Sequence, residues 1–334
     1  MTSATDVERL PPGYYQMLCP PVAEPGFNDE RELRKRWGAS WGSHDEVGVL
    51  RVVLMRAPGS EFEQIDARHY DPRVDALVDP DGGWYWTGDR APDLERLAEQ
   101  HAGLRSTLER EGVEVVLAES IAPRFPKAIY TRDPLVSMPG GVVIGRLAPL
   151  MRRGEEASIS RAVVNRGAPI LRTIVGTGMV EGGSLVKLNA TTAAYGTSIR
   201  CNEEGAEQLR ETLRWLGVEL IVVPMTGFAI HLDGRLGMFD VDKALVDPTG
   251  LPYWFLERLQ QLEIEPIWVD PEEHWAINCL AVAPGRVVIT DDCPKTTAAL
   301  ERRGVTVIPI PYDEIHHNGG GIHCSTMELL REPA

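Results

Sequence analysis

The sequence predicts an α/β fold made of five copies of one unit, each with two strands, a helix and a further strand. Five times an amphipathic stretch, in most copies ending at a glycine, is followed by a Val- and Ile-rich stretch. A copy takes about 40 to 55 residues, close to the length of a propeller blade, so we expect radial or solenoidal repetition that can close into a ring. No strand is followed by GxGxxG, which argues against a dinucleotide-binding fold.

The five helix–strand pairs follow one another along the chain, and the second and fourth are the weaker copies. In the first helix Leu94, Leu97, Leu104 and Leu108 recur at three- and four-residue spacing, which is typical of one buried helix face. The pairs are 91–112 with 113–120, 155–167 with 168–175, 202–217 with 218–225, 252–263 with 264–270, and 294–304 with 305–312. Further strand-like runs lie at 140–148, 184–189, 235–240 and 283–292.

The composition is that of an ordinary globular protein and argues against some classes of function. The chain has 334 residues, of which 43% are hydrophobic and 25% charged. A formal net charge of −15 argues against a nucleic-acid partner, since phosphate binding needs clustered Lys and Arg. We find no apolar signal core and no stretch of membrane-spanning length. The cysteines form no CxxC pair, so we expect a reducing, cytoplasmic location; they are Cys19, Cys201, Cys279, Cys293 and Cys324.

Polar residues occur at strand ends in different copies, where a ring would bring them together. Each motif alone is weak, because a Glu before Gly-Gly is usually a turn residue and a lone Cys is usually a small buried hydrophobe. His231 and Asp233 are two apart, so in a strand both project from one face. The candidates are Arg132 and Asp133 in "TRDP", Glu181 in "EGGS", His231 and Asp233 in "HLDG", and His323 and Cys324 in "GGGIHC".

Together these residues indicate chemistry on a planar cation. Cys324 would attack as a thiolate, and His231 could act as general base and acid with a carboxylate to orient it. Several acids around a thiolate suit a peptide carbonyl poorly, because its intermediate develops negative charge. They suit a guanidinium, which carboxylates hold through paired hydrogen bonds and whose charge stabilises the thiolate. The residues therefore favour a guanidino substrate.

The same motifs, in the same order, resemble the guanidino-group-modifying superfamily, the penteins. "TRDP", "EGGS", "HLDGRLGMFD" and "GGGIHCSTMEL" carry the resemblance, which extends over roughly residues 45 to 330. The superfamily includes arginine deiminase, dimethylarginine dimethylaminohydrolase and the glycine amidinotransferases. The resemblance implies a five-bladed α/β propeller of ββαβ repeats. We expect an N-terminal extension at residues 1–44, packed on a single catalytic domain at residues 45–334.

The resemblance also implies roles for single residues. Cys324 matches the nucleophile and His231 the general acid and base, while Glu181 and Asp233 match catalytic acids near the guanidinium and His231. Asp133 matches a guanidinium-binding carboxylate. Arg200 and Arg153 match arginines around the substrate's α-carboxylate, although Arg152, next to Arg153, could equally be the match. Ser184 stands where many hydrolases of the family have Asp, so the specificity at this substrate-binding position is open. The family uses no metal or other cofactor.

The leading hypothesis is a cysteine-dependent hydrolase of arginine metabolism, acting on arginine, a methylated arginine or a related guanidine through a thiouronium on Cys324. The alternatives are an amidinotransferase and, third, a binding propeller without catalysis. A metal site at His316, His317, His323 and Cys324 matches no common zinc spacing. We expect a small cationic guanidino substrate and no nucleic-acid or membrane partner, and homo-oligomerisation is open. We expect Cys19 to be a core residue.

Overall fold

Five three-stranded sheets share one topology in the computed structural model, which describes residues 11, 13, 25–121, 123 and 125–334. In each sheet the central strand pairs antiparallel with one neighbour and, beyond a helix, parallel with the other. The α/β class is confirmed. The sheets are β18 (Met327–Arg331), β1 (Leu50–Met55) and β5 (Glu114–Leu117); β6 (Leu135–Met138), β7 (Gly141–Ile144) and β8 (Ile170–Thr173); β9 (Leu185–Asn189), β10 (Thr192–Thr197) and β11 (Glu219–Pro224); β12 (Leu236–Asp240), β13 (Lys243–Val246) and β14 (Glu265–Trp268); β15 (Leu280–Ala283), β16 (Arg286–Thr290) and β17 (Thr306–Ile310).

In each of the five sheets a helix connects the central strand to its parallel neighbour. These helices lie where the amphipathic stretches predict them. These helices are α2 (Leu94–Arg110), α3 (Glu155–Arg166), α4 (Glu203–Trp215), α5 (Tyr253–Gln261) and α6 (Pro294–Glu301). The face of α2 that holds Leu97, Leu104 and Leu108 is buried, but Leu94 in the first turn is 43% exposed. Gly112, Gly167 and Gly217 have left-handed backbone just after their helices, as expected for a helix C-terminus.

The first and last strands of the described residues lie in one sheet. Strand β18, near the C-terminus, pairs antiparallel with β1, with Val53 opposite Glu328. The first sheet therefore takes its hairpin partner from the opposite end of the chain, whereas the other four are continuous in sequence. Such a closure makes the last strand necessary for completing the first sheet.

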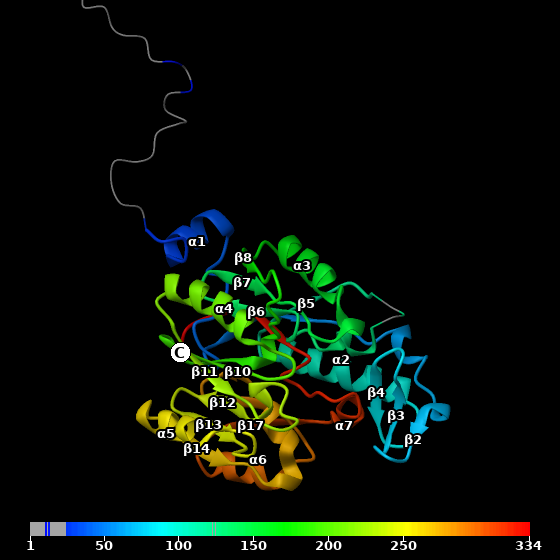
Figure 1. Cartoon of the computed structure of the whole chain (residues 1–334). Helices are drawn as coiled ribbons and strands as arrows, with labels where there is room; N and C mark the ends of the chain where they lie inside the picture. The colour runs from blue at the N-terminus through cyan, green and yellow to red at the C-terminus, as the bar shows by residue number, and fades with distance from the viewer. Residues whose placement is uncertain (1–10, 12, 14–24, 122, 124) are drawn as a thin grey trace, which may run out of the picture.

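A sixth sheet lies outside the repeat and was not predicted. It contains β2 (Tyr70–Asp71), β3 (Ala76–Asp79) and β4 (Trp84–Thr87), all antiparallel, and is inserted between β1 and α2. Figure 1 shows it at the right, beyond α2. The end of β4 contacts the main body, because Thr87 N donates to the carbonyl of His317.

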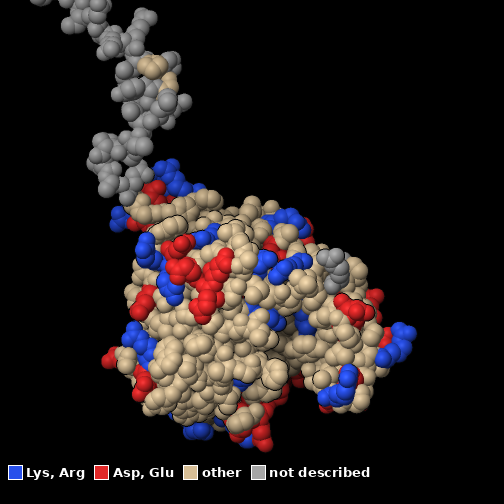
Figure 2. All heavy atoms as spheres, in the orientation of Figure 1, with Lys and Arg blue, Asp and Glu red and all other residues tan. Residues whose placement is uncertain are grey.

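The described part of the N-terminal region contains α1 (Glu30–Trp37), capped by the Asp29 side chain. Gly42 N donates to the carbonyl of Leu329, so this segment contacts β18. The division at residue 44 stays a prediction, and Cys19 lies outside the described residues. Among the described residues no helix is both long and apolar enough to cross a bilayer. Acidic and basic side chains are interspersed over the face shown in Figure 2.

Short helical turns complete the structure. Several precede the first strand of a unit and hold the polar motifs in place. They are η2 (Ser60–Phe62), η3 (Ala67–His69), η4 (Pro126–Ile129), η5 (Leu150–Arg152), η6 (Gly182–Ser184), η7 (Leu232–Gly234), η8 (Pro271–Asn278) and α7 (Asp313–His316).

Candidate active site

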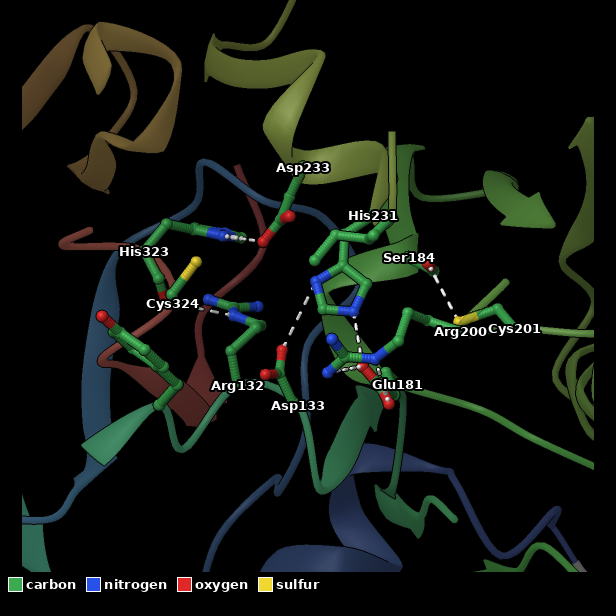
Figure 3. A network of polar contacts seen from close by, with 12 residues as sticks. Arg132, Asp133, Glu181, Ser184, Arg200, Cys201, His231, Asp233, His323 and Cys324 are labelled. Atoms are coloured by element: carbon green, nitrogen blue, oxygen red, sulfur yellow. Dashed lines mark hydrogen bonds and ion pairs between the residues drawn. The ribbon is translucent and has the colours of Figure 1, made fainter. Parts of the chain in front are cut away.

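The candidate residues lie at equivalent places, just before the first strand of each unit. Asp133 precedes β6, Glu181 precedes β9, and His231 and Asp233 precede β12. Cys324 precedes β18 in the same way. Figure 3 shows Asp133, His231, Asp233 and Cys324 directed toward a common space. The predicted convergence of these motifs is therefore present in the structure, although their roles remain predictions.

Cys324 is partly exposed and is held by an asparagine that sequence reasoning missed. Asn278 Nδ2 donates to the thiol sulfur at 3.1 Å, and its Oδ1 accepts from the backbone N–H of Cys324 at 3.1 Å. Asn278 occupies the equivalent position before β15, so the repeat itself is the signal that could have identified it. The two hydrogen bonds fix both the backbone and the side chain of the candidate nucleophile.

The three glycines before Cys324 are required by close contacts. Gly319 has a φ of +86°, and a Cβ there would lie 2.0 Å from the Tyr85 hydroxyl. A Cβ on Gly320 would lie 2.5 Å from the Tyr130 ring, and one on Gly321 would lie 2.7 Å from Asn278 Oδ1. The loop can therefore pass this close to its neighbours only without side chains.

His231 is paired with a fully buried carboxylate. Its Nε2 lies 2.6 Å from Glu181 Oε2, and Arg200 holds the same carboxylate at 3.0 Å and 2.8 Å. Burial alone raises the pKa of Glu181, but the hydrogen bond and the positive charges of His231 and Arg200 outweigh it and lower the pKa to about 2. Burial lowers the pKa of His231. Asp133 and Glu181 raise this pKa by more than burial lowers it, so the net shift is upward. This histidine is suited to carry a proton.

Asp133 and Asp233 are held by different side chains. Asp133 forms an ion pair with the buried Arg152, and its other oxygen, Oδ1, lies 3.6 Å from His231 Nδ1 without a hydrogen bond. Asp233 Oδ2 accepts from His323 Nδ1 at 2.9 Å, if that nitrogen carries the proton. His323 thus orients an acid.

Two cavities meet at Cys324. One is lined by Cys324, His231 and Asp233 together with Trp275 and Phe228. The other is lined by Cys324, His231 and Asp133, and by Lys127, Arg152, Arg200 and Tyr85 among others. A group bound over the sulfur would therefore have one aspartate on each side.

Burial raises the pKa of the Cys324 thiol, and the negative charges of Asp233 and Asp133 raise it further. The hydrogen bonds from Asn278 and Gly321 act in the opposite direction without cancelling this shift. These effects favour the neutral thiol of Cys324 over the thiolate. A cation placed between the aspartates would favour the thiolate.

Asp133, Glu181 and His231 offer ligand atoms within 4.8 Å of one another, the spacing a metal ion needs. The carboxylates already face guanidinium groups, Asp133 that of Arg152 and Glu181 that of Arg200. These cations supply the positive charge that a metal would bring. The arrangement fits an ion-paired acid cluster better than a metal centre.

Two predicted binding residues do not line either cavity. Arg153 donates through Nε to the carbonyl of Leu147, and its neighbour Arg152 lines the cavity instead. Ser184 is fully buried and accepts a hydrogen bond from Cys201 at 3.1 Å. Cys201, Cys279, Cys293 and Cys324 are free thiols, and a cytoplasmic location stays a prediction.

Comparison with known proteins decides the family. The arginine deiminase family model matches residues 120–252 and 265–331, which is more than half of the chain. The chain belongs to the arginine deiminase family. All the candidate residues from Asp133 to Cys324 lie within the matched residues.

Individual relatives of this arginine deiminase family member differ in activity. An arginine deiminase of Latilactobacillus sakei is 27% identical over 255 residues, covering 62% of this chain and 62% of that protein. Dimethylarginine dimethylaminohydrolase of Pseudomonas aeruginosa is 26% identical over 238 residues, covering 71% of this chain and 90% of that protein. The superfamily resemblance is thereby confirmed, whereas the substrate is not determined.

Solved structures show the same fold. The P. aeruginosa dimethylarginine dimethylaminohydrolase with bound citrulline has a TM-score of 0.68 at 24% identity, covering 84% of this chain and 100% of that chain. An amidinotransferase of saxitoxin biosynthesis from Microseira wollei has a TM-score of 0.69 at 16% identity, covering 89% and 98%. At these identities the likeness concerns the fold alone.

Proposed function

We propose that the protein is a cysteine-dependent hydrolase of a guanidino group, with Cys324 as nucleophile and His231 as general acid and base. The observation that carries the proposal is the position of Cys324 between the aspartate-lined walls of two cavities, with His231 on both. Membership of a family of guanidine-modifying enzymes supports it.

The proposed reaction begins with the cation. A guanidinium that bridges Asp133 and Asp233 would offset the two charges that disfavour the thiolate of Cys324, so the thiol releases its proton to solvent as substrate binds. The thiolate then adds to the central carbon. His231 donates a proton to the departing nitrogen, the C–N bond breaks, and a thiouronium remains on sulfur.

Water completes the reaction. His231, now neutral, removes a proton from water as the oxygen attacks the same carbon. The C–S bond breaks, the departing sulfur takes the proton of the hydroxyl group to regenerate the thiol, and a neutral ureido product leaves. Glu181 stabilises the protonated form of His231 in both half-reactions, because its carboxylate is held ionised by Arg200.

Amidino transfer is a second candidate. The cavity on the Asp233 side, with Trp275 and Phe228 in its lining, could admit an amine that replaces water. The amine would then attack the thiouronium and leave as a new guanidine. The likeness in fold to an amidinotransferase supports keeping this alternative.

We also propose that the five repeated sheets are arranged radially as a five-bladed propeller. Their shared topology, the pairing of the last described strand with the first, and the convergence of five equivalent loops support this arrangement.

The test is a panel of arginine, methylated arginines and simpler guanidines, with and without amine acceptors. Hydrolysis gives ureido product without an acceptor, whereas transfer gives a new guanidine only with one. Cys324→Ser should lose turnover by at least about a thousandfold while the circular dichroism spectrum is unchanged. Cys293→Ala, which removes a thiol outside both cavities, is the matched control. An active Cys324→Ser protein would exclude the mechanism.

A further inference from the structure

The cavity on the Asp133 side contains more positive than negative side chains. Its lining includes Lys127, Arg152 and Arg200, against the single carboxylate of Asp133. Arg152 is paired with Asp133 and Glu155, and Arg200 is paired with Glu181. Lys127 differs, because the hydrogen-bond acceptors of its Nζ among the described residues are backbone carbonyls and not carboxylates.

Lys127 is a buried cation that is held in place by neutral groups. Its Nζ donates to the carbonyl oxygens of Tyr85, at 3.0 Å, and of Asn318. It also lies 3.6 Å from the centre of the Tyr85 ring. Tyr85 belongs to β4 of the inserted sheet, outside the residues that the family model matches. The insertion therefore helps to build this end of the cavity.

Such a lysine lacks its counter-ion. Burial and the nearby charges of Arg152 and Arg200 lower the pKa of Lys127 well below its usual value. Buried charges are stable only when they are paired, and an anion bound beside Lys127 would offset all three effects. The cavity also reaches Cys324, so an anionic group here can belong to the molecule whose guanidinium reacts.

We propose that this cavity binds the carboxylate of a guanidino acid that has no α-ammonium group, with Lys127 as its charged partner. The inference rests on the proposed function and specifies its substrate class. The guanidinium takes Asp133, which is the only acid among the described residues of this lining, so none of them offers a carboxylate for a second cation.

An α-amino acid such as arginine fits less well for the same reason. Its ammonium group would lie close to its carboxylate and therefore close to Lys127, a like charge. Asn318 offers a buried side-chain oxygen without a hydrogen bond, but the carbonyl of the same residue already accepts from Lys127. An ammonium group placed there would meet the lysine.

The experiment compares kcat/KM of the full chain for pairs of substrates that differ only in the α-amino group. The pairs are 5-guanidinopentanoate with arginine, 4-guanidinobutanoate with 2-amino-4-guanidinobutanoate, and 3-guanidinopropanoate with its 2-amino analogue. We expect the acid without the amine to be preferred by at least about tenfold at the best chain length. Equal or better turnover of the amino acids overturns the inference but leaves the proposed function. No turnover of any guanidine overturns the proposed function itself.

A variant assigns the preference to Lys127. In Lys127→Gln the ratio of kcat/KM for the best guanidino acid to that for butylguanidine should fall about tenfold, through KM more than kcat. Lys295→Gln, a surface lysine paired with Asp270 and Glu272, is the matched control. An unchanged ratio in folded Lys127→Gln overturns the assignment. If this buried variant does not fold, the substrate pairs measured on the unaltered chain still decide the substrate class.

Discussion

The pairing of His231 with Glu181 determines when the histidine carries a proton. Glu181 is fully buried, and its two oxygens accept from His231, Arg200 and the backbone of Ala148. Because it remains ionised, it favours the protonated imidazole and raises the pKa of His231. A general acid gains from this shift, since it keeps its proton to higher pH.

Removing this charge should therefore move the pH profile. In Glu181→Gln the pKa of His231 falls, so the alkaline limb of kcat should shift to lower pH by about one unit. The profile should be measured from pH 5 to 10. Glu211→Gln, which removes a surface acid paired with Arg172, should leave the limb in place. An unshifted limb in Glu181→Gln would exclude His231 as the titrating acid.

The two aspartates should suppress the reactivity of the free thiol. Their charges raise the pKa of Cys324, so Asp233→Asn lowers that pKa and increases the thiolate fraction at a given pH. We expect alkylation of Cys324 by iodoacetamide at pH 8 to be faster by about threefold to tenfold. Asp240→Asn, a partly exposed acid paired with Lys243, serves as control. Slower alkylation in folded Asp233→Asn would contradict this account.

For single residues, the sequence predicts which side chains have the chemistry of the site better than it predicts which side chains contact one another. Cys324, His231 and the acids could be identified because their residue types stand at repeated positions. Asn278 was missed because an asparagine before a strand is common, and Lys127 because nothing local marks a buried lysine. Arg152 and Arg153 cannot be distinguished by motif, since only the turn η5 decides which side chain enters the cavity.

The loop before β18 is the element that positions the nucleophile. Gly321 lies against Asn278, and Asn278 in turn holds both the backbone N–H and the sulfur of Cys324. The loop and η8 therefore act as one support. Crowding on either side moves the sulfur relative to His231.

Gly321→Ala should displace this support. The added Cβ would lie 2.7 Å from Asn278 Oδ1, so we expect kcat/KM to fall by at least about tenfold with a folded protein. Gly103→Ala in α2 meets nothing within 4 Å and should keep activity while raising stability by about 0.5 to 1 kcal/mol. Full activity in Gly321→Ala would mean that the loop is not rigid.

The elements of the repeat were predicted because each unit has its own periodic signal. The face of α2 with Leu97, Leu104 and Leu108 and the glycines after three of the helices agree with the structure. The sheet of β2, β3 and β4 was not predicted, because its strands are only two to four residues long. Such short strands give no periodicity to recognise.

At the scale of the whole molecule, a buried chain of charges joins β18 to the site. Arg132 pairs with Glu328 at 2.7 Å, and Lys187 bridges Glu328 at 2.8 Å and Glu46 at 2.9 Å. Glu46 lies 3.8 Å from His323, which holds Asp233. The strand that joins the two ends of the chain is thus tied to the acid beside Cys324.

Removing the charge of Glu328, at the centre of this network of ion pairs, should destabilise the fold. Glu328→Gln leaves two buried cations without a full counter-charge, so we expect to lose about 3 to 5 kcal/mol of unfolding free energy in urea. Glu332→Gln removes an exposed partner of Arg51 in the same C-terminal segment and should cost less than about 1 kcal/mol. Equal effects of the two variants would contradict a central role for the network.

The long-range pairing could not be read from local signals. The sequence predicts five similar units, but it does not indicate that β18 completes the sheet of β1, since 271 residues separate them. Glu328 lies in "GGGIHCSTMEL" and Lys187 in the strand-like run at 184–189, but neither pattern indicates that these two ions lie in the interior. The pairing of β18 with β1 and the buried ion pairs both depend on how the repeated units pack against one another.

The central claim is covalent catalysis at Cys324, and the most direct measurement is the mass of the intact protein after acid quench during turnover of a guanidine. The account predicts an adduct on the peptide that contains Cys324, with the mass of the guanidine minus that of the departing amine or ammonia, accumulating when breakdown is slow. Cys324→Ser should show no adduct. Turnover by the unaltered protein with no adduct at any quench time, and with activity retained in Cys324→Ser, would contradict the claim.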